Sequence, residues 1–190
     1  MREIAYRRAD AAAYAERWAL GRNPAYYDFE ALGGDCTNFV SQCLFAGCGV
    51  MNWEPETGWY YASLRYRAPA WTGADPLGRF LTGNRGAGPY AEEVPCAHLQ
   101  PGDVVQLGRG DGGYYHSLFV LGRSGGRLYV AAHSYDALWR ALDSYRFQTL
   151  RCLHIAGARS VTVQTPGASE REGAALRSAH ARYAGVHCAP

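Results

Sequence analysis

The sequence predicts an α+β domain in which helices come first and an antiparallel sheet follows. Apolar residues in the first quarter of the chain recur at helical spacing, whereas short apolar runs alternate with glycine-rich turns from about residue 99 onwards. Helices followed by a run of strands are typical of α+β domains. The length of 190 residues suits one domain with a hydrophobic core.

Three helices are expected in the first half of the chain. The first, over residues 10–20, begins with an aspartate that can cap it and is rich in alanine. The second, over residues 36–45, follows the backbone break at Gly33–Gly34 and has an apolar stripe. Residues 50–89 are rich in Trp, Tyr, Gly and Pro, and within them only residues 75–81 have the pattern of a short helix.

Four strands are expected in the second half, over residues 103–107, 115–121, 127–133 and 149–155. The glycine-rich residues 122–126 predict a hairpin turn between the second and third of these strands. We therefore expect one domain over residues 1–156, with helices packed on an antiparallel sheet. Residues 157–190 are small and polar, and we expect them to form a loosely ordered tail.

Composition narrows the range of partners. The net charge of +2 and the scattered arginines give no reason to expect binding to nucleic acid or to an anionic membrane. No apolar stretch is long enough to span a bilayer, and the N-terminal residues lack the apolar core of a secretory signal. These observations favour a cytoplasmic protein, and they leave the oligomeric state open.

The six cysteines show none of the close C-x-x-C pairs of zinc sites, so no metal is expected. Most of them are expected to be small buried apolar residues. Cys36 is the exception, because it follows Gly33–Gly34 and Asp35 at the start of a predicted helix.

A helix N-terminus favours negative charge, and we therefore expect it to lower the pKa of the Cys36 thiol. The backbone N–H of Cys36 is then also placed to stabilise an oxyanion. Cys36 is accordingly the predicted nucleophile. The alternative is an inert buried cysteine, which is the commoner kind.

His116 is the predicted base of this nucleophile. It lies at the start of the strand over 115–121, where strand alternation puts it on the same face as Leu118 and Val120. We expect this face to pack toward the helix of Cys36, because a base needs a rigid neighbouring element. The alternative is a core histidine with satisfied hydrogen bonds.

His133 is the predicted third residue of the site. If the strand over 127–133 forms a hairpin with the strand over 115–121, the end of one lies beside the start of the other. His133 then falls next to His116 and can hold its far nitrogen in the right tautomer. Asp136 is the alternative for this role.

Several motifs resemble those of the bacterial putative amidase domain family, a relative of the NlpC-type and CHAP cell-wall hydrolases. They occur in the order that this family uses, and the resemblance covers roughly residues 5–155. The motifs are GGDCTNFVSQCL at 33–44, WYY at 59–61, LQPGDVVQL at 99–107, YYHSLFV at 114–120 and AAHSYD at 131–136.

The resemblance implies a papain-like, NlpC-type α+β fold, with the nucleophile at a helix N-terminus packed on an antiparallel sheet. It places the catalytic cysteine at Cys36, the histidine at His116 and the third polar residue at His133 or Asp136. It also implies that the turn at residues 102–103 is structural.

Substrate or oxyanion contacts are expected from two places. A tyrosine upstream of the cysteine has this role in NlpC-type enzymes, which implies Tyr26 or Tyr27 here, and Asp35 adjoins the nucleophile. Trp59 and Tyr60 lie in the aromatic segment that predicts a groove for a sugar or a peptide. The alternative is that these aromatic residues form a local core.

The sequence therefore favours a cysteine amidase or peptidase that acts through a thioester acyl-enzyme and needs no cofactor. By resemblance, the substrate is a peptide or a peptidoglycan-derived amide, and the location is extracytoplasmic if a signal has been removed. Two alternatives stay open: an acyltransferase with the same Cys–His site, and a non-catalytic binding module with an aromatic groove.

Overall fold

The computed structural model describes residues 1–161 of the chain. Its helices are α1 (Arg8–Trp18), α2 (Cys36–Cys48), α3 (Pro69–Thr72) and α4 (Ala74–Gly83), with 3-10 turns η1 (Glu30–Leu32), η2 (Cys96–His98) and η3 (Leu142–Ser144). Its strands are β1 (Arg2–Ile4), β2 (Gly88–Glu93), β3 (Val104–Gly108), β4 (Tyr114–Ser124), β5 (Arg127–Ala132), β6 (Ala137–Ala141) and β7 (Thr149–Ser160).

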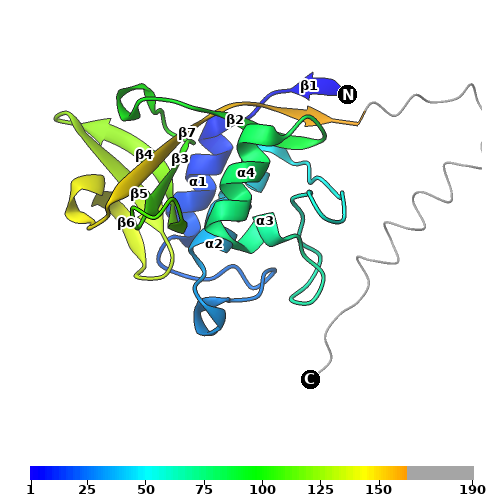
Figure 1. Ribbon diagram of the computed structural model, residues 1–190, viewed down its shortest axis with the longest axis horizontal. Helices are drawn as coiled ribbons and strands as arrows, with labels where there is room; N and C mark the ends of the chain where they lie inside the picture. The colour runs from blue at the N-terminus through cyan, green and yellow to red at the C-terminus, as the bar shows by residue number, and fades with distance from the viewer. Residues whose placement is uncertain (162–190) are drawn as a thin grey trace, which may run out of the picture.

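The strands form one antiparallel sheet in the order β1-β7-β3-β4-β5-β6, and β2 also pairs with β7. The long strand β7 runs the length of the molecule and connects β3 with β1 and β2 (Figure 1). The predicted α+β class is confirmed. The strands β1, β2 and β6 add to the four that the sequence predicted.

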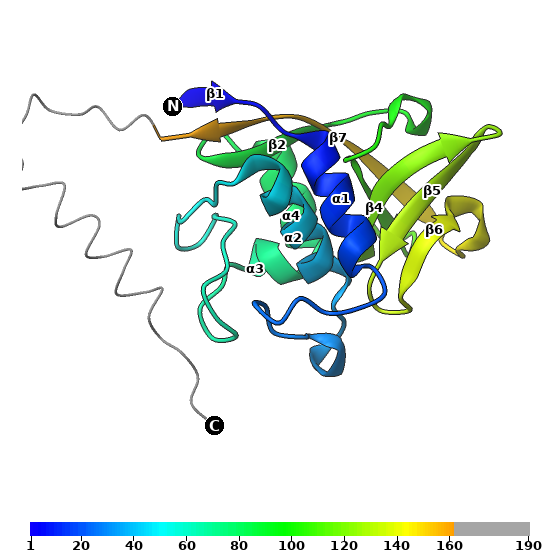
Figure 2. The same ribbon diagram turned by 180° about the vertical axis from the view of Figure 1, so that it is seen from behind.

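The helices gather on one face of the curled sheet, and α1 and α2 lie side by side there (Figure 2). The core on this face joins Phe39 and Val40 of α2 to Phe119 of β4. A second apolar cluster lies on the other face and includes Leu118 and Val120. Within residues 1–161, no helix has both the length and the apolar character needed to cross a membrane.

Helix α2 is longer than its predicted range of 36–45. Gly47 lies inside the helix, where a Cβ would collide with the Tyr6 ring. The helix ends at Gly49, whose φ of 68° is the left-handed conformation of a C-cap and whose N–H donates to the Phe45 carbonyl at 2.7 Å. Nearly all of α2 is buried, so its first residue is held in a fixed place.

The predicted boundary at residue 156 is wrong, because β7 continues to Ser160. Arg2 of β1 pairs with Ser160, and Ala158, which pairs with Ile4, is fully buried. The strand period persists through residues 157–160, although their small side chains resemble a loop composition. Residues 162–190 of the predicted tail lie outside the described residues.

The turn before β3 is organised by Asp103, which is fully buried. Its Oδ1 accepts hydrogen bonds from Arg8 Nη1 at 2.7 Å and from the Ile155 N–H at 3.0 Å. Its Oδ2 accepts from the Gln100 N–H at 2.8 Å and lies 3.0 Å from His154 Nδ1. One carboxylate therefore links α1, the turn and β7, which fits the structural role that the sequence implied for this turn.

Replacing Asp103 with Ala is expected to lower the free energy of unfolding by about 3–5 kcal/mol, because Arg8 then loses its buried partner and two N–H donors lose their acceptor. Urea unfolding monitored by circular dichroism measures this change. The matched control is Asp143→Asn at the exposed Arg127 pair, which we expect to leave the unfolding midpoint nearly unchanged. Equal losses for both variants would contradict the assigned role of Asp103.

Candidate active site

The chain enters α2 through Gly33 and Gly34, at two positions whose backbone conformation favours glycine. Gly33 and Gly34 have φ values of 110° and 115°, which other residues adopt at a cost. A Cβ on Gly34 would also lie 3.0 Å from the hydroxyl oxygen of Ser134. That hydroxyl accepts the N–H of Asp35 at 2.8 Å. The glycines therefore allow the start of α2 to pack closely against the segment after β5.

Asp35 sits at the N-cap position of α2 with only 1% of its surface exposed. Its Oδ1 accepts from the Phe29 N–H at 2.9 Å and from Asn38 Nδ2 at 2.8 Å. Its Oδ2 lies 2.5 Å from His133 Nδ1. The expectation that Asp35 contacts substrate is therefore wrong, because this carboxylate is buried and its oxygens are engaged within the fold.

Cys36 is the first residue of α2 and is 7% exposed. Burial raises the pKa of its thiol, and this outweighs the N–H of Ser117 and the hydroxyl and N–H of Thr37, which lower it. The charge of Asp35 raises the pKa further. The expected lowering by the helix N-terminus is therefore wrong for this state, because loss of water destabilises the thiolate more than the nearby donors stabilise it.

Strand β4 passes directly beside Cys36, but its side-chain faces are the reverse of those expected. The hydroxyl oxygens of Ser117 and Thr37 are 3.0 Å apart, so Ser117 points toward α2. His116, the preceding residue, shares its side of the strand with Leu118, which belongs to the cluster on the far face of the sheet. Among residues 1–161, no hydrogen bond joins the His116 ring to the Cys36 sulfur, and their catalytic pairing stays a prediction.

His116 is 8% exposed and lies near two tyrosine rings. The ring centroids of Tyr115 and Tyr145 are 6.4 and 6.1 Å from its own. Burial, together with the positive charge of Arg140, lowers the pKa of His116 to about 4. The imidazole is therefore neutral at pH 7, which is the form that can accept a proton.

His133 has partners other than those predicted. Its Nδ1 lies 2.5 Å from Asp35 Oδ2, its Nε2 lies 2.8 Å from the Trp18 carbonyl oxygen, and its ring stacks on Phe39 at 4.2 Å between centroids. Both ring nitrogens are therefore engaged within the fold. The predicted contact with His116 is absent among the described residues, because His133 continues the helix-facing side of β5.

Asp136, the alternative third residue, also binds elsewhere. Its two carboxylate oxygens accept from Arg22 Nη1 at 3.0 Å and Arg22 Nη2 at 2.9 Å. The same guanidinium has its Nε 3.7 Å from Asp35 Oδ2 and 3.4 Å from Asp28 Oδ2. Arg22 was missed from the sequence, where nothing in its neighbourhood indicates that it gathers carboxylates from three separate segments.

Trp59 and Tyr60 are core residues, and the prediction that they contact substrate is wrong. Trp59 is fully buried and donates from Nε1 to the Ser41 hydroxyl at 3.0 Å. Tyr60 is 5% exposed beneath the ring of Trp53, at 5.0 Å between centroids. Here the alternative of a local aromatic core is correct.

The two tyrosines before the nucleophile differ in exposure. Tyr26 stacks on Trp71 at 5.9 Å between centroids, and burial raises the pKa of its hydroxyl to about 12. Tyr27 is 40% exposed, and its carbonyl accepts from Asn38 Nδ2 at 3.1 Å. Tyr27 therefore lies against the first turn of α2, while an oxyanion role for either hydroxyl stays a prediction.

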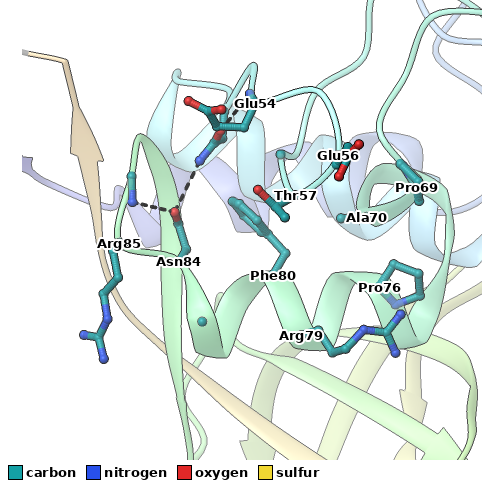
Figure 3. Close-up of a pocket in the computed structure, with 14 residues that line it drawn as sticks. Glu54, Glu56, Thr57, Pro69, Ala70, Pro76, Arg79, Phe80, Asn84 and Arg85 are labelled. Atoms are coloured by element: carbon teal, nitrogen blue, oxygen red, sulfur yellow. Dashed lines mark hydrogen bonds between the residues drawn. The ribbon is translucent and has the colours of Figure 1, made fainter.

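Two depressions mark the surface of the described residues. The larger, of about 620 Å³, lies between α4 and the loop over 52–58, around Thr57 and Phe80 (Figure 3). No cysteine or histidine lines it. The smaller, of about 530 Å³, includes Tyr115, the neighbour of His116. Only the second depression therefore adjoins a predicted catalytic residue.

Comparison with known proteins gives a family and two relatives. A family model described as putative amidase domain matches residues 5–155. The uncharacterized protein YhbB of Bacillus subtilis (strain 168) is 36% identical over 144 residues, which cover 73% of this chain and 45% of that protein. The uncharacterized protein YjcM of the same organism is 30% identical over 135 residues, covering 66% of this chain and 30% of that protein. The chain thus spans less than half the length of these relatives, and no solved structure matches it significantly.

Iodoacetamide is expected to alkylate Cys36 slowly at pH 7 and faster only as the pH rises above 9. The thiolate is the reactive form, and a raised pKa leaves it scarcely populated near neutrality. Mass spectrometry of peptides measures the rate, with the more exposed Cys96 as an internal reference. Rapid labelling of Cys36 below pH 7 would contradict the assigned burial effect.

Replacing His133 with Gln is expected to lower the free energy of unfolding by about 3–5 kcal/mol, because the buried Asp35 loses its partner. The midpoint of the His116 titration, followed by NMR, should stay within experimental error in the variant that remains folded. Asp136→Asn at the solvent-facing Arg22 pair is the control and should cost much less. A shifted His116 midpoint in His133→Gln would instead support the original orienting role.

Proposed function

Because the chain belongs to the putative amidase domain family, we propose that it hydrolyses an amide bond with Cys36 as nucleophile and His116 as base. Membership of this family indicates amide hydrolysis. One observation supports the proposed residues most directly. The sulfur of Cys36 lies at the first turn of α2, close to the backbone N–H of Ser117, which is the residue after His116.

The start of α2 has the donors that an amide hydrolase needs. The first N–H groups of a helix have no acceptor within it, and no side chain caps them here. Asp35 directs its oxygens to Phe29, Asn38 and His133 and does not cap the N–H of Cys36. We assign the backbone N–H of Cys36 as a donor to the oxyanion that forms when the carbonyl is attacked.

In the proposed reaction, the neutral imidazole of His116 takes the thiol proton while the sulfur of Cys36 attacks the amide carbon. The tetrahedral intermediate collapses, the C–N bond breaks, and His116 returns the proton to the leaving amine. A thioester remains on Cys36. Water then attacks it with His116 again as base, which releases the acid and restores the thiol.

In this proposal the Cys36 thiol and the His116 imidazole are both neutral before the substrate binds. A thiol with a raised pKa and an imidazole with a pKa of about 4 do not exchange a proton in the free protein. Proton transfer is therefore coupled to attack, when the sulfur gains its bond to carbon. This step requires the backbone at the start of β4 to rearrange, because His116 shares a face with Leu118 and side-chain rotation does not carry a strand residue to the other face.

The positions of the proposed nucleophile and base also support a finer classification of the fold. A nucleophile at a helix N-terminus, packed on an antiparallel sheet that carries the histidine, supports a papain-like arrangement related to NlpC-type enzymes. We take peptide amides of the peptidoglycan stem as the substrate class to test first. The activity of a longer protein of this kind, including any transfer of the acyl group to an amine, belongs to the same proposal.

Incubation with peptide amides is expected to produce a hydroxylamine-sensitive thioester on Cys36, detected by mass spectrometry. Cys36→Ala should abolish both the thioester and the release of amine, and His116→Ala should slow acylation by about 10²–10⁴-fold. Because His116 must be neutral, kcat/KM should fall as the pH drops through about 4. Cys43→Ala, on the same helix but fully buried, is the control. Undiminished turnover in Cys36→Ala would refute the mechanism.

A further inference from the structure

Two arginines make cation–π contacts with the tyrosine rings near His116. The guanidinium carbon of Arg109 lies 4.9 Å from the centroid of the Tyr115 ring, and that of Arg140 lies 4.1 Å from the centroid of the Tyr145 ring. The centroids of these two tyrosine rings lie 6.4 and 6.1 Å from that of His116. Stacking on an aromatic face holds a guanidinium in place without using its N–H donors for another charge.

No carboxylate neutralises this charge among the described residues. Salt bridges within residues 1–161 include neither Arg109, Arg140 nor Arg146. Asp143, the acidic residue of the same loop, is paired with Arg127. Arg140 donates from Nε to the Ser144 hydroxyl at 2.9 Å and forms no salt bridge within residues 1–161.

A depression on the surface adjoins two of these arginines. Arg109 and Arg146 line the depression of about 530 Å³, together with the rings of Tyr115 and Phe147. The remaining residues of its lining are Gly108 and Gln148, so no carboxylate faces this depression within residues 1–161.

We propose that this depression is a carboxylate subsite, so that the substrate is a peptide amide with a free carboxylate one or two residues from the cleaved bond. The inference rests on the proposed function. Arg109 and Arg146 bind the carboxylate, while Tyr115 and Phe147 pack on the apolar part of the residue that carries it. A neutral peptide amide meets the same aromatic rings without the charge pairing.

The same arrangement assists the base. The positive charge of Arg140 opposes protonation of His116, and a bound carboxylate offsets that charge. Substrates with the carboxylate therefore favour the imidazolium that the reaction forms. This effect predicts that the carboxylate contributes to kcat as well as to KM.

Binding to full-length Cys36→Ala protein tests the subsite without turnover. The probes are an acetylated peptide amide substrate with a free C-terminal carboxylate and the same peptide ending in a carboxamide. Titration calorimetry should show about tenfold tighter binding of the acid, as two partly exposed charge pairs provide, and the difference should shrink at high salt. Arg109→Gln with Arg146→Gln should remove it, and Lys at both positions should restore part of it.

Arg79→Gln with Arg85→Gln, at the larger depression, is the matched control and should leave the preference intact. If Cys36→Ala protein without any arginine substitution bound the two peptides with equal affinity, the proposed subsite would be refuted. The two proposals fail separately. If wild type forms the Cys36 thioester equally well from both peptides, the subsite is wrong and the amidase function stands. If the acid binds preferentially and no thioester forms, the function is wrong and the site is a carboxylate-binding site.

Discussion

The burial of one carboxylate, that of Asp35, determines where the candidate site lies. A buried charge is tolerated only when donors surround it, and here the donors come from three separate parts of the chain. The Phe29 N–H belongs to the segment before η1, Asn38 to α2, and His133 to the end of β5. Satisfying Asp35 therefore brings the sheet, the glycine turn and the helix together, and Cys36 is the next residue.

This constraint also explains the resting chemistry of the site. The packing that positions Cys36 removes water from its thiol, and burial near the rings of Tyr115 and Tyr145 removes water from His116. Both groups are thereby kept neutral. In the proposed mechanism, activation depends on two groups of the substrate: the carbonyl carbon that the sulfur attacks, and the carboxylate that offsets the charge of Arg140. The site is in this sense incomplete until the substrate binds.

Local pattern predicted those parts of the structure that depend on neighbours in the sequence. The start of α2 followed from the glycine pair, and the hairpin of β4 and β5 followed from period-two runs around a glycine turn. Strand β1 was missed because it pairs with Ser160 across the whole chain. The partners of His133 were missed because the hairpin argument considered proximity along the strands and ignored which face each histidine takes. Exposure of Trp59 and the pKa of Cys36 depend on tertiary packing, which no local pattern records.

The central claim is that Cys36 attacks a carbonyl with His116 as its base, and a reversible adduct tests it most directly. A peptide aldehyde, labelled with carbon-13 at the carbonyl, is added to wild type and to His116→Ala. Carbon NMR is expected to show a hemithioacetal in wild type, absent after Cys36→Ala, with a concurrent shift of the His116 ring signals. A hemithioacetal that forms equally well in His116→Ala, with the His116 signals unmoved in wild type, would contradict the account.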